Sequence, residues 1–151
     1  MIEPSENTGL TANAGLPLVF VGQAQKEFII NQALSMIDAC LFGIVAEART
    51  DPPDPVDDGA AFLVMPSANG EWVGKDDHLA LRIADSWIFI EPMPGMRLFD
   101  RAAGCMRFFS SEWQLGEAPI APSGGSVVDS EARSAIDAII GLLSAHGFFT
   151  N

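Results

Sequence analysis

The stretch from residue 61 to residue 115 constrains the fold most, because short apolar or aromatic runs alternate there with turn signals. Such runs, separated by Gly, Pro, Asn and Asp, are typical of the strands of a small antiparallel sheet. We therefore predict about six short strands, at Ala61–Met65, Leu79–Ile83, Ser86–Ile90, Met96–Phe99, Cys105–Phe109 and Glu112–Leu115.

Two segments of this region have similar sequences. Residues 81–83 read Leu-Arg-Ile and are followed by Ser86 and Trp87, whereas residues 106–108 read Met-Arg-Phe and are followed by Ser111 and Trp113. Two copies are too few for a repeat architecture. They predict two similar hairpins.

A helix is predicted before the sheet region, between Ala24 and Phe42. Gly43 is a natural stop for it, and residues 44–49 then read as a further strand. Its apolar residues recur at helical spacing and form one amphipathic stripe of Ile30, Ala33, Leu34, Ile37 and Leu41.

A second helix is predicted after the sheet region. Asp129 or Ser130 can cap its first amides, and Gly147 after His146 supplies a C-terminal stop. One face repeats the apolar residues Ala132, Ile136, Ile139 and Leu143. The sequence therefore predicts an α+β fold, a small antiparallel sheet flanked by an N-terminal and a C-terminal amphipathic helix.

The 151 residues fit a single domain, which can bury roughly 70% of its unfolded surface without metals or disulfides. Residues 1–15 lack large apolar side chains almost entirely and predict a flexible N-terminal arm. Residues 16–117 form the expected helix-plus-sheet domain, and residues 118–127 are a linker by composition. Residues 128–151 are the C-terminal helix and tail, packed on the same domain or on a neighbouring subunit.

Five large apolar residues are candidates for an interface with another subunit. Within the first helix, Phe28, Ile29 and Met36 fall largely outside the main stripe, and Phe148 and Phe149 lie beyond the second helix. The surplus either packs within the domain, which is the commoner outcome, or meets another subunit.

The charge excludes some partners. A formal charge of -12 repels phosphate backbones and anionic headgroups, so we expect neither nucleic acid nor a membrane as a partner. The apolar stretch at residues 16–21 is too short for a membrane span and lacks a basic flank. We expect a protein made and kept in the cytoplasm, for which cell lysis is a likelier route to the outside than secretion.

No catalytic or cofactor-binding pattern is evident, so we expect a protein that is not an enzyme. His78 and His146 have structural explanations and no motif beside them. Cys40 and Cys105 lie in apolar runs, which favours buried free thiols, and zinc and other cofactors are not predicted. The aspartates of residues 51–59 lack the spacing that wraps calcium.

Three tryptophans have two interpretations. Trp72, Trp87 and Trp113 lie in the sheet region, where a half-buried tryptophan is usually part of the core. The alternative is an exposed stacking surface for sugar rings, which would make the protein a receptor-binding module for cell-surface polysaccharide.

Several segments resemble a known family. Residues 22–27 (Gly-Gln-Ala-Gln-Lys-Glu), followed by residues 31–34 and 37–39, resemble the N-terminal signature of the phage-associated family called domain of unknown function 2793. Residues 58–64 and 70–80 resemble it too, as does the ending at residues 135–147. The resemblance covers most of residues 16 to 147.

Members of this family are associated with prophages and gene transfer agents, in fibre or spike components. The resemblance therefore implies a virion structural protein without enzymatic activity. We expect a base or adaptor that attaches a head spike or tail fibre to the capsid vertex or tail base. Such appendages are usually cyclic homo-oligomers.

Overall fold

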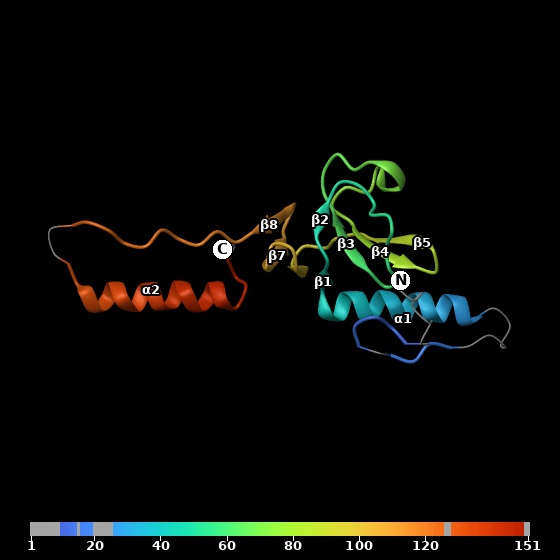
Figure 1. Ribbon diagram of the computed structural model, residues 1–151, viewed down its shortest axis with the longest axis horizontal. Coiled ribbons are helices and arrows are strands. Elements are labelled where there is room, and N and C mark those ends of the chain that lie inside the picture. The colour runs from blue at the N-terminus through green and yellow to red at the C-terminus, as the bar shows by residue number, and fades with distance from the viewer. Residues whose placement is uncertain (1–9, 15, 20–25, 126–127, 150–151) are drawn as a thin grey trace.

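The computed structural model of the chain describes residues 10–14, 16–19, 26–125 and 128–149. Along these residues it has two helices and eight strands, which confirms the α+β class (Figure 1). In chain order they are α1 (Lys26–Phe42), β1 (Ile44–Val45), β2 (Ala48–Arg49), β3 (Ala61–Val64), β4 (Leu79–Ile83), β5 (Ser86–Ile90), β6 (Arg97–Asp100), β7 (Cys105–Phe109), β8 (Trp113–Leu115) and α2 (Ser130–Ala145), with a 3-10 turn at Gly70–Trp72.

The strands form two four-stranded sheets, so the expected single antiparallel sheet of six strands is wrong. One sheet has the order β1-β6-β7-β8 and the other β2-β3-β4-β5. The segment expected to be one strand over residues 44–49 divides between them. Its first part pairs in parallel with β6, and its second part pairs in parallel with β3. Periodicity predicts strands, but partners far along the chain decide which sheet each strand joins.

Both sheets have the same connectivity. Each has a short parallel edge strand followed by three antiparallel strands joined in sequence. The two similar hairpins predicted from the sequence are therefore β4–β5 and β7–β8. Between β4 and β5, Ala84 (φ 47°) and Asp85 (φ 60°) make the tight turn with two positive φ angles that suits a two-residue hairpin loop.

The core lies on both faces of β3. Successive strand side chains point to opposite faces, and all four residues of β3 are buried. Leu63 belongs to a cluster shared with α1 and the other sheet, whereas Phe62 and Val64 belong to a second cluster around Trp72. α1 lies against the β2-β3-β4-β5 sheet (Figure 1).

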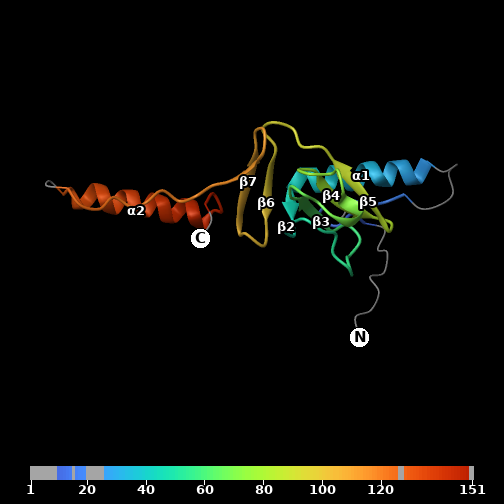
Figure 2. The same cartoon turned by 90° about the horizontal axis from the view of Figure 1, so that it is seen from above.

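The second helix projects from the molecule, so the expectation that it flanks the sheet is wrong. Figures 1 and 2 show α2 extending away from both sheets. No side chain of α2 is buried within the described chain. Residues 118–125, most of the predicted linker, run beside it without helix or strand (Figure 1). Residues 126 and 127 of that prediction lie outside the described residues.

Both predicted helix stops are confirmed. Gly43 (φ 53°) and Gly147 (φ 74°) adopt the left-handed conformation that glycine favours. After α2, the Phe148 N–H donates to Leu143 O (3.0 Å) and the Gly147 N–H donates to Ser144 O (2.9 Å), a Schellman arrangement. The Met106 N–H then donates to Gly147 O, which joins the end of α2 to β7.

The predicted flexible arm is wrong for residues 10–14. Thr11 is buried, and Asn13 and Ala14 donate hydrogen bonds to Asp38 of α1. Residues 1–9 and 15 of that prediction lie outside the described residues.

Candidate functional site

The most unusual surface of the molecule is the outward side of α1, which is apolar. Ile29, Ile37 and Leu41 are 69%, 56% and 68% exposed, and Ile30 and Ala33 of the same side are also exposed. We call these five residues the α1 face. An amphipathic stripe ordinarily faces the core. The predicted stripe lies instead at the surface, with only Leu34 half-buried among Ile30, Ala33, Leu34, Ile37 and Leu41.

The residues of α1 that are fully buried are a small residue and a carboxylate, and Met36 packs half-buried against the same core. Ala39 is 1% exposed, and its small size lets the helix approach the sheets closely. Asp38 is 2% exposed. Its Oδ2 accepts from the Asn13 N–H (2.8 Å) and side-chain amide (3.0 Å), and its Oδ1 accepts from the Ala14 N–H (2.7 Å).

These hydrogen bonds explain how a carboxylate can be buried here. Burial alone would raise the pKa of Asp38, but hydrogen bonds from Ala14, Asn13 and Thr11 outweigh it and hold the pKa below its usual value. Asp38 therefore stays ionised and joins residues 11–14 to α1. Sequence reasoning missed this role, because the partners of Asp38 lie 24 and 25 residues before it in the chain.

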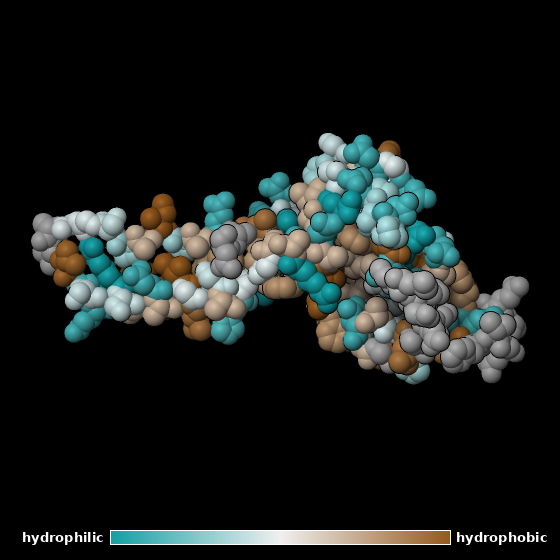
Figure 3. Space-filling model, viewed as in Figure 1, coloured by the Kyte–Doolittle hydropathy of each residue, from teal (hydrophilic) through white to brown (hydrophobic). Residues whose placement is uncertain are grey.

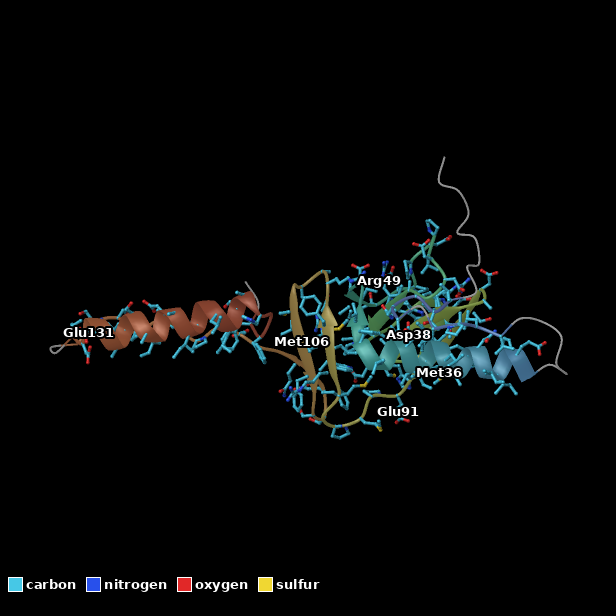
Figure 4. All side chains as sticks on the ribbon, turned by 90° about the horizontal axis from the view of Figure 1, so that it is seen from below. Met36, Asp38, Arg49, Glu91, Met106 and Glu131 are labelled. Atoms are coloured by element: carbon cyan, nitrogen blue, oxygen red, sulfur yellow. The ribbon has the colours of Figure 1, made fainter. Side chains whose placement is uncertain are left out.

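The five candidate interface residues do not form one patch. Phe28 and Ile29 are well exposed at the start of α1, whereas Met36 packs against the main core cluster. Figure 4 shows Met36 and Asp38 further along the same helix. Phe148 is 51% exposed and Phe149 is half-buried, both beyond the end of α2. For Met36 the structure thus shows the first of the two alternatives, packing within the domain, and the interface hypothesis stays a prediction for the four other residues.

The tryptophans do not form a shared stacking surface. Trp72 is fully buried, so it offers no face to a sugar and that part of the alternative is wrong. Its ring lies 5.1 Å from that of Trp87, which is half-buried beneath the Arg82 guanidinium, 5.3 Å from the ring centre. Trp113 belongs to the other core cluster, and its Nε1 donates to Asp77 O (2.8 Å). Trp113 thus links the two sheets.

Each histidine ring makes a local contact with the backbone. The His78 Nδ1 lies 2.9 Å from Asp76 O, and the His146 Nδ1 lies 2.8 Å from Leu142 O, so both rings meet backbone carbonyls. Among the described residues no group of three or more His, Cys, Asp or Glu side chains could hold a metal ion.

The two cysteines are free, as predicted, but only Cys105 is buried. The expectation of burial is wrong for Cys40, which is exposed on α1 because the helix turns its apolar side outward. Desolvation nevertheless raises the pKa of both thiols. Both thiols are therefore poor nucleophiles at neutral pH.

A buried ion pair fixes the sheet nearest α2. The Arg107 Nε donates to Asp100 Oδ2 (2.8 Å), and these residues are 8% and 1% exposed. Asp100 Oδ1 also accepts from the Ala103 N–H (3.0 Å). Sequence analysis did not single out this pair, because Asp100 falls just beyond the strand predicted over residues 96–99 and its partner Arg107 lies in the next predicted strand.

α2 carries a second outward apolar surface. Ile136, Ile139 and Leu142 are 42%, 57% and 59% exposed. Brown, hydrophobic residues are visible along this projecting part in Figure 3. At the base of the helix, a hollow of about 440 Å³ is lined by residues that include Phe108, Leu115 and Phe148.

Neither helix has the length and apolar character needed to cross a membrane, within the part of the chain that the structure describes. A comparison with curated proteins returns no match. One family model does match, that of the proteins of unknown function called DUF2793, across residues 30–114. That range spans most of α1 and both sheets, more than half of the chain, and agrees with the resemblance noted in the sequence. The chain therefore belongs to the DUF2793 family.

Proposed function

We propose that this protein is a non-enzymatic structural component of a phage-like particle, a phage or a gene transfer agent. In this role it is the base or adaptor that attaches a head spike or tail fibre to other particle proteins at the capsid vertex or tail base. It works as a cyclic homo-oligomer, located in the virion after synthesis in the cytoplasm and release by lysis.

The observation that supports this proposal is the α1 face. Large apolar patches exposed on a soluble surface mark sites of interaction. The patch carries no ionised side chain, although the chain has a formal charge of -12. An uncharged apolar surface on an acidic molecule suits a partner protein better than it suits nucleic acid or an anionic membrane.

Docking by this surface is rigid. Asp38 and Ala39 hold the opposite side of α1 against the domain. The face is therefore pre-organised, so little conformational entropy is lost when a partner binds.

The test is retention of the tagged chain by purified particles from a producing strain. Ile37→Glu places a charge in the α1 face, and Ile120→Glu is the matched control because Ile120 is 96% exposed in the linker. We expect sedimenting particles to retain the wild type and Ile120→Glu but not Ile37→Glu. A wild-type chain that particles never retain contradicts the proposal.

Recognition of cell-surface polysaccharide is the weaker candidate. Trp87 alone among the three tryptophans keeps a partly exposed ring without a hydrogen bond from its indole, and Arg82 covers part of it. A pull-down with host capsule polysaccharide decides between the two functions. Binding that Trp87→Ala abolishes would favour the receptor module, because an adaptor ignores sugars.

A further inference from the structure

The strand β5 (Ser86–Ile90) is an edge of its sheet (Figure 1). Among the described residues, β4 is the only strand that pairs with it. The other three edge strands, β1, β2 and β8, have only two or three residues, and short edges protect a sheet from further pairing. β5 has five residues, pairs with β4 in unbroken register and contains no proline or lysine. It therefore lacks the usual protection of an edge strand within its own length.

The backbone groups of Trp87 and Phe89 point to the open side of β5. In β4 the Arg82 N–H donates to Ala60 O (2.9 Å) and Arg82 O accepts from the Gly59 N–H (2.7 Å), so both groups of Arg82 face the chain that enters β3. Trp87 is the residue opposite Arg82, so its own N–H and C=O face away from β4. The direction repeats every second residue, so Phe89 does the same. Within the described part of the chain, these four groups make no hydrogen bond.

A carboxylate stands at each end of this open edge. Asp85 precedes β5, Glu91 follows it, and both are exposed. Asp85 makes an ion pair with Arg82 at 3.6 Å, but exposed ion pairs contribute little. Lys75 and Arg82 lie over aromatic rings of β5, which places them on a face of the sheet and not along its edge. Both ends of the edge are therefore acidic.

We propose that β5 adds a strand from a partner protein, an extended segment with a Lys or Arg at each end of an apolar run. Extended peptides bind to open sheet edges in this way, and their main-chain hydrogen bonds supply the affinity. The two cations stand beside Asp85 and Glu91. The charge of -12 on this chain also speeds its encounter with a basic segment.

The same carboxylates oppose pairing of two copies of this chain through β5. Antiparallel pairing of two β5 edges sets Asp85 of one copy beside Glu91 of the other, because both residues are three positions from Ile88. Parallel pairing sets identical carboxylates together. Like charges on facing strands destabilise a pair, so the edge favours a partner with opposite charges over a second copy.

This inference does not rest on the proposed function. β5 lies within residues 30–114, which the family model matches, so the edge belongs to the domain that this chain shares with its family. The α1 face and the β5 edge consist of different residues. Each surface can therefore be tested while the other stays intact.

The first test follows amide hydrogen exchange of the full-length chain by nuclear magnetic resonance. In the free chain the amides of Trp87 and Phe89 should exchange quickly, whereas the Ile88 amide, which faces β4, should be protected. The probe is a capped peptide, Lys-Val-Thr-Val-Thr-Val-Lys. At about ten times its dissociation constant it should slow exchange at Trp87 and Phe89 about tenfold.

Three outcomes of this test overturn the inference. The first is an absence of binding, and the second is binding that leaves the Trp87 and Phe89 amides unprotected. The third is protection of these amides in the free chain. If that protection increases with protein concentration, a second copy covers the edge.

The second test separates backbone pairing from attraction between charges. The same peptide with N-methyl groups on the amides that face β5 keeps its lysines but cannot donate to the carbonyls of Trp87 and Phe89. It should bind at least about tenfold more weakly, since two hydrogen bonds are lost. Equal binding of the methylated peptide overturns the inference.

The third test changes the charges at the two ends of β5. Asp85→Asn combined with Glu91→Gln removes both carboxylates, and asparagine tolerates the positive φ of position 85 (60°). At physiological ionic strength this variant should bind the lysine peptide about fivefold more weakly. The control, Glu112→Gln combined with Glu131→Gln, makes the same change of net charge at exposed positions outside this sheet and should leave binding unchanged. A peptide with glutamates in place of the lysines that binds equally well overturns the inference.

Discussion

Leu41 and Asp38 lie close together on α1. Helical periodicity suggests that mutation of Leu41 lowers the stability more than mutation of Asp38 does, and we expect the opposite. Full burial of a leucine side chain contributes about 1.5–3 kcal/mol. Leu41 is 68% exposed, so roughly a third of that amount, about 0.5–1 kcal/mol, is lost in Leu41→Ala. Asp38 accepts three hydrogen bonds, and a hydrogen bond to an ionised group contributes about 1.5–3 kcal/mol.

Asp38→Ala also leaves the amides of Asn13 and Ala14 without their acceptor. Because such contributions are not additive, we expect a loss of about 3 kcal/mol. Urea unfolding at one fixed protein concentration measures both effects. With a slope near 1.5 kcal/mol per M, the midpoint should fall by about 2 M for Asp38→Ala and about 0.5 M for Leu41→Ala. A larger fall for Leu41→Ala than for Asp38→Ala would refute the outward placement of the apolar side of α1.

Three further outcomes follow from the buried groups and the glycines. The lowered pKa of Asp38 contributes stability that is present above the unfolded pKa and lost as the pH falls through the folded pKa, so the difference between the urea midpoints of the wild type and Asp38→Asn should shrink as the pH is lowered below about 4. Arg107→Ala leaves a buried carboxylate unpaired and should cost about 3–5 kcal/mol in urea unfolding, whereas the exposed Arg101→Ala should cost less than about 0.5 kcal/mol. In Gly147→Ala the added Cβ stands on a left-handed backbone and 3.0 Å from a Phe99 atom, so the free energy of unfolding should fall by about 1–2 kcal/mol. In Gly141→Ala the added Cβ has open space within a helix, so the helix content measured by circular dichroism should rise.

Much of the element order could be predicted from local signals. The strands at residues 79–83, 86–90 and 105–109 were predicted with their observed bounds, because apolar runs bounded by turn residues act over a few positions. Asp129 caps α2 by accepting from the amides of Glu131 and Ala132, as its position suggested. Both helix stops follow from glycine, whose lack of a Cβ permits positive φ.

The candidate site was harder to predict. Periodicity identified an apolar stripe on α1 but not the direction in which it faces. Asp38 is buried because backbone amides of residues 13 and 14 solvate its charge, and that contact joins residues far apart in the chain. Cys40 is exposed because it lies on the apolar side of α1, which faces outward. The Trp72 ring is fully buried because residues of β3 and β5 pack around it, and composition does not show which residues will be its neighbours.

The sequence by itself determined the class of the fold, the positions of its helices and most of its strands, and the apolar character of both helices. These depend on propensity and period, which are properties of neighbouring residues. Tertiary structure alone decided that residues 44–49 divide between two sheets, that α1 turns its apolar side outward and that α2 projects. Each of these depends on which distant groups pair, and pairing energy is set by geometry in space and not by order along the chain.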